Sequence, residues 1–579
     1  MKHTPIIVLF ILCLWTISCK EQERKQVNTD VPNETNTSVY FNGDIITMEG
    51  DAPQYVEALV ARDGKIAFVG SKDAALKEAG DGAKMIDLGG KTLLPGFLDA
   101  HGHVWNAGFQ AVSANLLPAP DGEGTSVDEI VRLLKEWADK NNEAVSKYGA
   151  IIGFGYDDSQ LEEKRHPTAD DLDKVSTEVP VWIIHQSGHI SATNHKGLEA
   201  IGYKAGVEDP AGGTIRRESG TDVPNGVLEE MAMFIPLIKF MGTLDSSANE
   251  LIAKAGIEAY LKYGYTTAQE GRATSDNCET WKTLGGRGEL PIDVAAFPDI
   301  QSQMDYMLKE GDSKEYNNHY RIAGVKLSLD GSPQGKTAWL TKPYVVPPPG
   351  QPKTYAGYPA IKDDMEVLRF VDSAFVHHWQ LLVHCNGDAA ADQLIRTVKK
   401  AEDEYGKDDR RTVMIHSQTV RTDQLDAMKE LGIIPSFFSM HTYYWGDWHR
   451  DETLGKERAY RISPTATALK KGILFTEHHD APVALPSSIM ILHTTVNRVS
   501  RTGDIIGPDE RVSPYVGLEA LTKWAAYQYF EQDHKGTLTP GKLADLVVLD
   551  KNPLKIDPSK ILDIQVLETI KEGNQVYKK

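Results

Sequence analysis

Cysteine is scarce in this sequence, with only four among 579 residues. Cys13 and Cys19 lie near the start of the chain, while Cys278 and Cys385 are too far apart in sequence to indicate a disulfide framework. No two cysteines have the Cys-x-x-Cys spacing of a structural zinc site. The sequence therefore predicts neither a disulfide framework nor a structural metal of that type.

Basic residues are in the minority. Lysine and arginine number 62 against 82 aspartate and glutamate, which gives a net charge of −20. A protein that binds nucleic acid needs basic patches for the phosphates, so no nucleic acid is expected as a partner. The charge leaves the substrate open, because surface charge need not reach an active site. The length favours one large domain with a smaller one.

An apolar run at the start of the chain, PIIVLFILCLWTI, is too short for a comfortable transmembrane helix. It follows Lys2 and fits the core of a secretory signal peptide. The stretch that ends in Ser18-Cys19 resembles a bacterial lipobox. The resemblance implies a signal peptide over residues 1–18, cleavage before Cys19 and a lipid on its sulfur. An uncleaved anchor and a plain signal peptide are the alternatives.

Residues 19–37 are polar and almost free of apolar side chains, so we expect a flexible tether. With a lipid on Cys19, this tether would attach the protein to a membrane. The expected location is the cell envelope of a bacterium, either the periplasm or the outer membrane. The oligomeric state stays open.

Short strands are predicted at both ends of the mature chain. Apolar and polar residues roughly alternate over 38–92, where Asn42-Gly43 and Asp63-Gly64 predict hairpin turns. The same pattern returns over 537–579. We therefore predict one small β-sandwich domain built from both ends.

The region 93–536 alternates apolar strands with helical stretches, which is typical of βα units. The predicted fold class is α/β, with a (β/α)₈ barrel of the TIM type. We place its strands at about residues 93–100, 180–185, 264–269, 321–328, 380–385, 412–417, 432–437 and 472–477.

Several of these strands end in histidine. His101 and His103 stand two apart, so on a strand both imidazoles point to the same side and suit a cation such as zinc. His384 and His416 end later strands. Strand ends in a barrel of this kind meet at one face. The pattern indicates a metal-dependent hydrolase.

Lys326 and Asp480 also follow apolar runs. A lysine ammonium cannot ligate a cation, but its carbamate, formed with CO₂, could bridge two metals. The alternative is an ordinary ion pair of Lys326 with Asp330. Asp480 at the end of the last strand could accept a proton from an activated water, or it could be a turn residue in Asp-Ala-Pro.

Several motifs together resemble the amidohydrolase superfamily, in particular the amidohydrolase family 3 branch with enzymes like N-substituted formamide deformylase. They include PGFLDAHGH, GVKLSLDGSPQGKTA, LLVHCNGDAAAD, RTVMIHSQ and GTLTPGKLADLVVLDKNP. The resemblance implies one or two divalent metals, zinc in the first place, and a carboxylated Lys326. The implied ligands are His101, His103, Lys326, His384, His416 and Asp480. The chain departs from the family pattern at His479, Ala389 and Pro333.

The expected reaction is hydrolysis of a non-peptide carbon–nitrogen bond in a small molecule, with Asp480 as general acid and base. His189 is a candidate for binding the substrate carbonyl, and His441 and Trp445 for contacting a substituent. The alternatives are a structural histidine and aromatic packing under a loop. An esterase, lactonase or phosphoester hydrolase on the same centre, or a non-catalytic binding lipoprotein, stays open.

Overall fold

The computed structural model describes residues 36–348 and 350–579. The predicted signal peptide, Cys19 and nearly all of the tether lie outside these residues. Within the described part of the chain, no helix is both long and apolar enough to cross a membrane.

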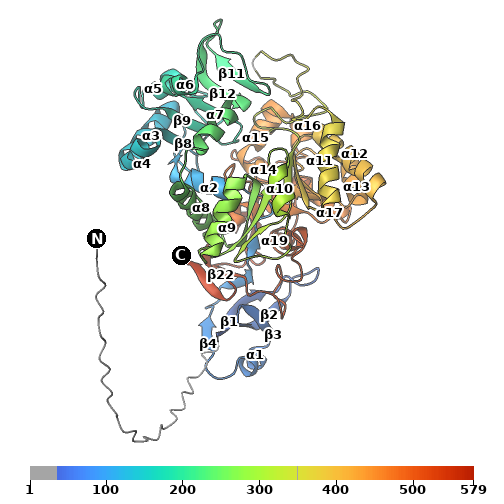
Figure 1. Ribbon diagram of the computed structural model, residues 1–579. Coiled ribbons are helices and arrows are strands. Elements are labelled where there is room, and N and C mark those ends of the chain that lie inside the picture. Colours follow the sequence, from blue (N-terminus) through green and yellow to red (C-terminus); the bar gives the residue numbers. More distant parts are fainter. Residues whose placement is uncertain (1–35, 349) are drawn as a thin grey trace, which may run out of the picture. The chain divides into compact units, whose positions relative to one another are not determined.

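The strands from the two ends of the chain form one mixed sheet (Figure 1). Its order is β23-β22-β21-β5-β1-β2-β3, with β4 paired to β1. The bounds are β1 Thr37–Ile46, β2 Tyr55–Arg62, β3 Lys65–Gly70, β4 Lys84–Asp87, β5 Thr92–Pro95, β21 Leu546–Leu549, β22 Val566–Lys571 and β23 Asn574–Lys578.

The predicted β-sandwich is therefore corrected to a single sheet. Strand β5 pairs in parallel with β1 on one side and antiparallel with β21 on the other. Because β5 has a partner on both edges, the N-terminal and C-terminal strands are continuous in one sheet. Helix α1 (Lys72–Ala79) covers Val39 and Val60 on one face.

The centre of the fold is a ring of parallel strands. Their order is β6-β13-β14 followed by β16-β17-β18-β19-β20. The bounds are β6 Phe97–Leu98, β13 Tyr265–Ala273, β14 Asp293–Pro298, β16 Val325–Ser328, β17 Leu381–Cys385, β18 Val413–His416, β19 Ile434–Phe437 and β20 Thr476–Glu477. This is the arrangement of a TIM-type barrel.

Backbone contacts connect the two sheets of the ring on both sides. A parallel bridge joins Asp299 after β14 to Lys326 in β16, and β15 (Tyr320–Ile322) extends the first sheet. On the other side, the Asp480 amide donates to the His101 carbonyl over 3.1 Å, and the His103 amide donates to Ala481 over 2.9 Å. These bonds join the segments that follow β6 and β20.

Helices surround the ring (Figure 1). The longer ones are α2 Val104–Val112, α8 Ser246–Leu261, α9 Ser275–Gly286, α11 Asp364–Val376, α12 Asp388–Tyr405, α13 Thr422–Glu430, α18 Ser488–Asn497 and α19 Pro514–Leu521.

One predicted barrel strand is wrong and another was missed. The strand expected at 180–185 is β9 (Val181–His185), which lies in a separate sheet of order β11-β12-β10-β9-β8-β7. That sheet is inserted between β6 and β13. The missing barrel strand is β14, whose sequence DVAAFP is fully buried but has few large apolar residues.

The inserted sheet has strands β7 Ala114–Asn115, β8 Ile151–Tyr156, β9, β10 Ile190–Thr193, β11 Gly213–Arg217 and β12 Pro224–Glu230. It has its own small core, with Leu134, Ile151 and Ile183 among its members. Helices α3 (Val127–Lys140) and α7 (Met231–Met241) belong to the same insertion.

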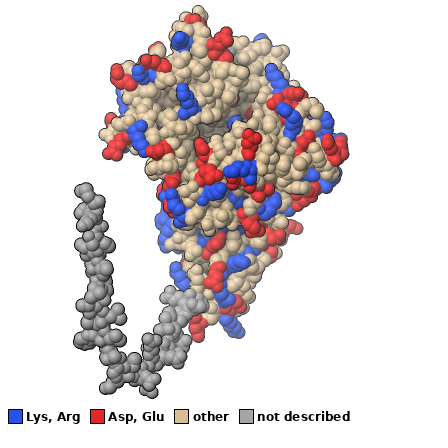
Figure 2. All heavy atoms as spheres, in the orientation of Figure 1, with Lys and Arg blue, Asp and Glu red and all other residues tan. Residues whose placement is uncertain are grey.

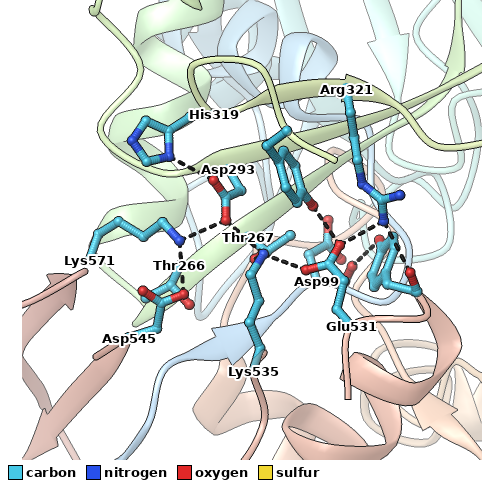
Figure 3. A network of polar contacts seen from close by, with 12 residues as sticks. Asp99, Thr266, Thr267, Asp293, His319, Arg321, Glu531, Lys535, Asp545 and Lys571 are labelled. Atoms are coloured by element: carbon cyan, nitrogen blue, oxygen red, sulfur yellow. Dashed lines mark hydrogen bonds and ion pairs between the residues drawn. The ribbon is translucent and has the colours of Figure 1, made fainter. Parts of the chain in front are cut away.

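A buried ionic network joins the barrel to the terminal sheet (Figure 3). Asp293 at the start of β14 accepts from Lys535 over 2.6 Å and from Lys571 of β22 over 2.7 Å. Lys571 also contacts Asp545 over 2.9 Å. These charges are shielded from solvent, so each depends on its partners.

Candidate metal centre

Five of the six predicted ligands lie at or just after the carboxyl ends of barrel strands, and Lys326 is the second residue of β16. His101 and His103 follow β6, and Lys326 lies in β16. The others lie in or after later strands: His384 in β17, His416 at the end of β18 and Asp480 after β20. The ring therefore brings together residues that are far apart in the sequence.

Asp480 lies among the imidazoles. Its Oδ1 is 3.3 Å from His101 Nε2 and 3.2 Å from His103 Nε2. Its Oδ2 is 3.9 Å from His416 Nε2. The ligand atoms of His101, His103 and Asp480 are close enough to hold one ion.

Lys326 and His384 complete the cluster. The Lys326 Nζ lies 2.9 Å from His101 Nε2, and the rings of His384 and His416 are 4.4 Å apart. The predicted alternative partner of Lys326 has a different role. Asp330 accepts from the amides of Asn386 over 3.0 Å and Gly387 over 2.7 Å, and its Oδ1 lies 3.2 Å from His384 Nδ1.

Each imidazole is oriented through its second nitrogen. His101 Nδ1 is 2.6 Å from Gln269 Oε1, and His103 Nδ1 contacts the Gly271 carbonyl. His416 Nδ1 is 3.1 Å from His478. Such contacts fix the tautomer and the direction of the remaining nitrogen.

One atom of the cluster lacks a hydrogen-bond partner. His416 Nε2 is buried and unpaired within the described chain, although buried polar atoms are nearly always satisfied. It faces Asp480 and the other imidazoles. A bound cation would satisfy this nitrogen, so the donor set fits a divalent metal.

Two of these residues also have strained backbones. His416 has φ +71° and Asp480 has φ +54°, a region that residues other than glycine rarely adopt. Each such conformation costs about 1–3 kcal/mol, and such residues concentrate at functional sites.

Burial sets the charge state of the cluster. It lowers the pKa of His101 to about 3, with a contribution from Lys326, and lowers that of His416 well below its ordinary value. Burial alone would raise the pKa of Asp480, but His416, His101 and His103 outweigh it and hold the pKa well below its usual range. The result is a neutral imidazole at His101 and at His416 beside a carboxylate, the protonation states that bind a metal.

Burial also lowers the pKa of Lys326 to about 7. An ordinary lysine has a pKa of about 10.4 and is almost fully charged near neutral pH. Lys326 therefore has a substantial neutral fraction at that pH. A neutral amine is the form that reacts with CO₂.

The cluster opens into a cavity of about 830 Å³. Figure 2 shows the corresponding face hollowed beneath the insertion. His189 lines the cavity, with its ring 6.2 Å from that of His384 and its Nδ1 2.9 Å from Glu230 Oε2. Glu230, the last residue of β12, was not predicted from the sequence.

The other two predicted substrate-binding residues differ from each other. His441 lines the cavity and pairs with His449 over 2.9 Å. Trp445 is buried behind it, with ring centroids 4.7 Å apart, and is not among the described residues that line the cavity. Its indole donates to Asp157 Oδ2 over 3.0 Å. Trp445 thus connects the barrel to the insertion.

Other groups of histidine and carboxylate exist in the described chain. In one of them, Asp293 is already neutralised by Lys535 and Lys571. In another, His185 contacts Asp158 over 3.1 Å and Asp157 over 3.6 Å as a buried ion pair. A third, at Asp170, Asp173 and His195, is largely exposed.

A parallel barrel with histidines and a carboxylate at its strand ends defines a class of metal-dependent hydrolases. The model of the amidohydrolase family matches residues 84–577. The chain belongs to the amidohydrolase family and is a hydrolase of carbon–nitrogen bonds.

Individual relatives resemble the chain over nearly its whole length. Protein LONG AFTER FAR-RED 3 of Arabidopsis thaliana is 28% identical, over 93% of this chain and 91% of that protein. N-substituted formamide deformylase of Arthrobacter pascens is 24% identical, over 90% and 95%. A solved structure of an uncharacterized metal-dependent hydrolase from Pyrococcus horikoshii has the same fold, with a TM-score of 0.71, 24% identity and coverage of 93% and 100%.

Proposed function

We propose that the protein hydrolyses a non-peptide amide or formamide-type bond in a small molecule. The observation that carries the proposal is Asp480 held among His101, His103 and His416 at the base of the cavity. The name of the Arthrobacter pascens relative agrees with this bond type.

The proposed ligands of one or two divalent ions, zinc in the first place, are His101, His103, His384, His416, Asp480 and a carboxylated Lys326. When bound, such an ion polarises the substrate carbonyl and makes water acidic enough to supply hydroxide near neutral pH. Carbamate formation requires the neutral amine of Lys326, which burial favours.

Asp480 is the proposed general base and acid. Its low pKa keeps it ionised, so it can accept a proton from the attacking water. The water oxygen bonds to the carbonyl carbon, the carbon–nitrogen bond breaks, and the proton passes from Asp480 to the leaving nitrogen. The products are a carboxylic acid and an amine.

His189 is proposed to bind the carbonyl oxygen. Burial would lower its pKa, but the Glu230 carboxylate outweighs burial and raises it. In the protonated ring, Nδ1–H donates to Glu230 and Nε2–H is left to donate into the cavity. A donor aimed at developing negative charge stabilises the transition state.

Asp480→Asn tests the role of this carboxylate. We expect kcat on an N-substituted formamide to fall by about 10²–10⁴, with metal content largely retained, because the proton carrier is lost. Asp276→Asn, a change at an exposed position of α9, is the control. Full activity of the Asp480 variant would contradict the proposal. Turnover of lactones or phosphotriesters in place of amides by the native protein would show that it hydrolyses a different bond type.

We further propose that Cys19 carries a lipid and tethers the protein to a membrane of the cell envelope. The support is the sequence of residues 1–37. Cys19→Ala should move the protein from the membrane fraction to the soluble fraction, whereas Cys13→Ala should leave it in the membrane fraction. An unchanged distribution of the Cys19 variant would contradict the proposal.

A further inference from the structure

Helix α7 (Met231–Met241) is apolar on every side. Its sequence MAMFIPLIKFM carries one charged residue, Lys239. Ile235 and Ile238 are 48% and 66% exposed. A surface helix normally keeps polar residues on its outer face, and clustered exposed apolar side chains mark places where something binds.

The side of α7 that adjoins these exposed residues lines the cavity above the metal centre. Met231, Phe234, Leu237 and Met241 all contribute to the cavity wall. Their spacing places them on one side of a helix. Phe109 of α2 and Ile184 of β9 are further apolar members of the same cavity. The cavity thus has an apolar compartment beside its polar base.

This apolar wall begins next to the site of chemistry. The ring of Phe234 lies edge-on to that of His189, with centroids 6.1 Å apart. His189 in turn neighbours His384 of the metal centre. A bond held between His189 and Asp480 would therefore extend its substituent along α7.

The size of the cavity agrees with this arrangement. At about 830 Å³ it lies at the upper end of the range for sites that hold drug-sized ligands, far larger than a simple formamide requires. A small polar substrate would leave the α7 side chains in water. An apolar substituent would cover them.

We propose that the face of α7 formed by Met231, Phe234, Leu237 and Met241 binds a bulky apolar substituent of the substrate, either an aryl group or an alkyl chain of several carbons. This inference rests on the proposed amide hydrolysis and names its substrate class. The face acts through hydrophobic contact, so each buried methylene should improve recognition about fourfold.

The test compares two series of substrates. The first contains N-alkyl formamides from methyl to hexyl and N-benzylformamide. The second contains N-methyl amides of fatty acids of matching length. We expect kcat/KM to rise about fourfold per methylene in one series, which identifies the side of the bond that faces α7. Phe234→Ala should reduce the benzyl-to-methyl ratio at least tenfold. Ile238→Ser changes an exposed side chain that is not among the described residues lining the cavity, so it is the matched control and should keep the native ratio.

A binding assay separates this inference from the proposed reaction. Calorimetry with benzylamine, hexylamine and hexanoate requires no turnover. Tight binding of any of them that Phe234→Ala weakens and Ile238→Ser does not would support the α7 site even if no amide were hydrolysed. Hydrolysis with no dependence on chain length, or ligand affinity that Phe234→Ala leaves unchanged, would overturn it.

Discussion

Asp330 shows how much of the metal centre depends on residues beyond the ligands. Its carboxylate accepts hydrogen bonds from the backbone amides of Asn386 and Gly387 and lies beside His384 Nδ1. The sequence allowed an ion pair with Lys326, yet Lys326 instead contacts His101. The difference arises because Lys326 points into the ring while Asp330 lies beyond the strand end.

Asp330→Asn should weaken metal binding about 10–100-fold, because the partner that orients a ligand controls its affinity. A competition titration with a zinc chelator measures this. Asp276→Asn is the control with an exposed carboxylate. Unchanged zinc affinity in the Asp330 variant would contradict this positioning role.

At the level of elements, α2 and α8 pack backbone against backbone directly behind His103. A Cβ on Gly256 of α8 would lie 2.0 Å from the Val104 carbonyl, and one on Gly108 would lie 1.8 Å from that of Ile252. Neither contact can be relieved by rotating a side chain. The two glycines therefore set the distance between the helices.

Gly256→Ala should lower the free energy of unfolding by at least about 1–3 kcal/mol, since overpacking forces the backbones apart. It should also lower metal content, because α2 begins immediately after His103. Gly286→Ala in α9 is the matched control, with open space around its Cβ. Equal thermal midpoints for the two variants would contradict the prediction.

The insertion contains a pH-sensitive pair. Burial would lower the pKa of His185, but Asp157 and Asp158 outweigh burial and raise it to about 9. Because the folded pKa lies above the ordinary value of about 6.5, this contribution to stability is complete below pH 6.5 and is lost as pH rises through 9. It amounts to at most about 3 kcal/mol.

Chemical denaturation at pH 6.5 and pH 9.5 tests this. The native protein should lose more stability over this interval than His185→Gln, which lacks the titrating group. His195→Gln, at an exposed histidine, is the control and should behave like the native protein. Identical losses in the native protein and the His185 variant would be evidence against the pair.

The sequence predicted the elements that carry a chemical signal better than those that do not. Histidines near strand ends marked β17 and β18 correctly as barrel strands. The strands that pair with them in the ring were predicted as well. Strand β9 looked like a barrel strand because VWIIH is apolar, but its neighbours β8 and β10 pair with it in the insertion. Strand β14 was missed because its alanines carry little periodic signal.

Pairing between strands that are distant in sequence was the other feature that the sequence did not predict. Nothing local in the sequence states that β5 has partners on both edges, so two sheets were expected where one exists. The burial of Trp445 likewise depends on Asp157, which is distant in sequence. These features are decided by tertiary contacts that periodicity does not encode.

At the scale of the whole molecule, the barrel and the terminal sheet are joined by buried charges (Figure 3). Lys535 and Lys571 hold the pKa of Asp293 well below its usual range, although burial would raise it. Both ammonium groups contact the same carboxylate oxygen. Removing that carboxylate would leave Lys571 with Asp545 and Lys535 with Glu531, so the two buried cations would lose the counter-charge that they share.

Asp293→Ala should therefore destabilise the protein by about 3–5 kcal/mol. Glu310→Ala, which breaks exposed ion pairs of Lys282 and Lys309, should change stability by at most about 1 kcal/mol. Denaturant unfolding measures both. Similar costs for the two variants would contradict the role of the network.

The most direct test of the metal centre is the metal content of the purified protein, set beside its amide hydrolysis. Elemental analysis should find one or two divalent ions per chain, and the His101→Ala, His103→Ala double variant should lose both the metal and the activity while remaining folded. A lower metal content in the Lys326→Ala variant than in the native protein would support a carbamate on Lys326. A folded native protein that hydrolyses amides but binds no metal, even after metal-supplemented expression, would contradict the account.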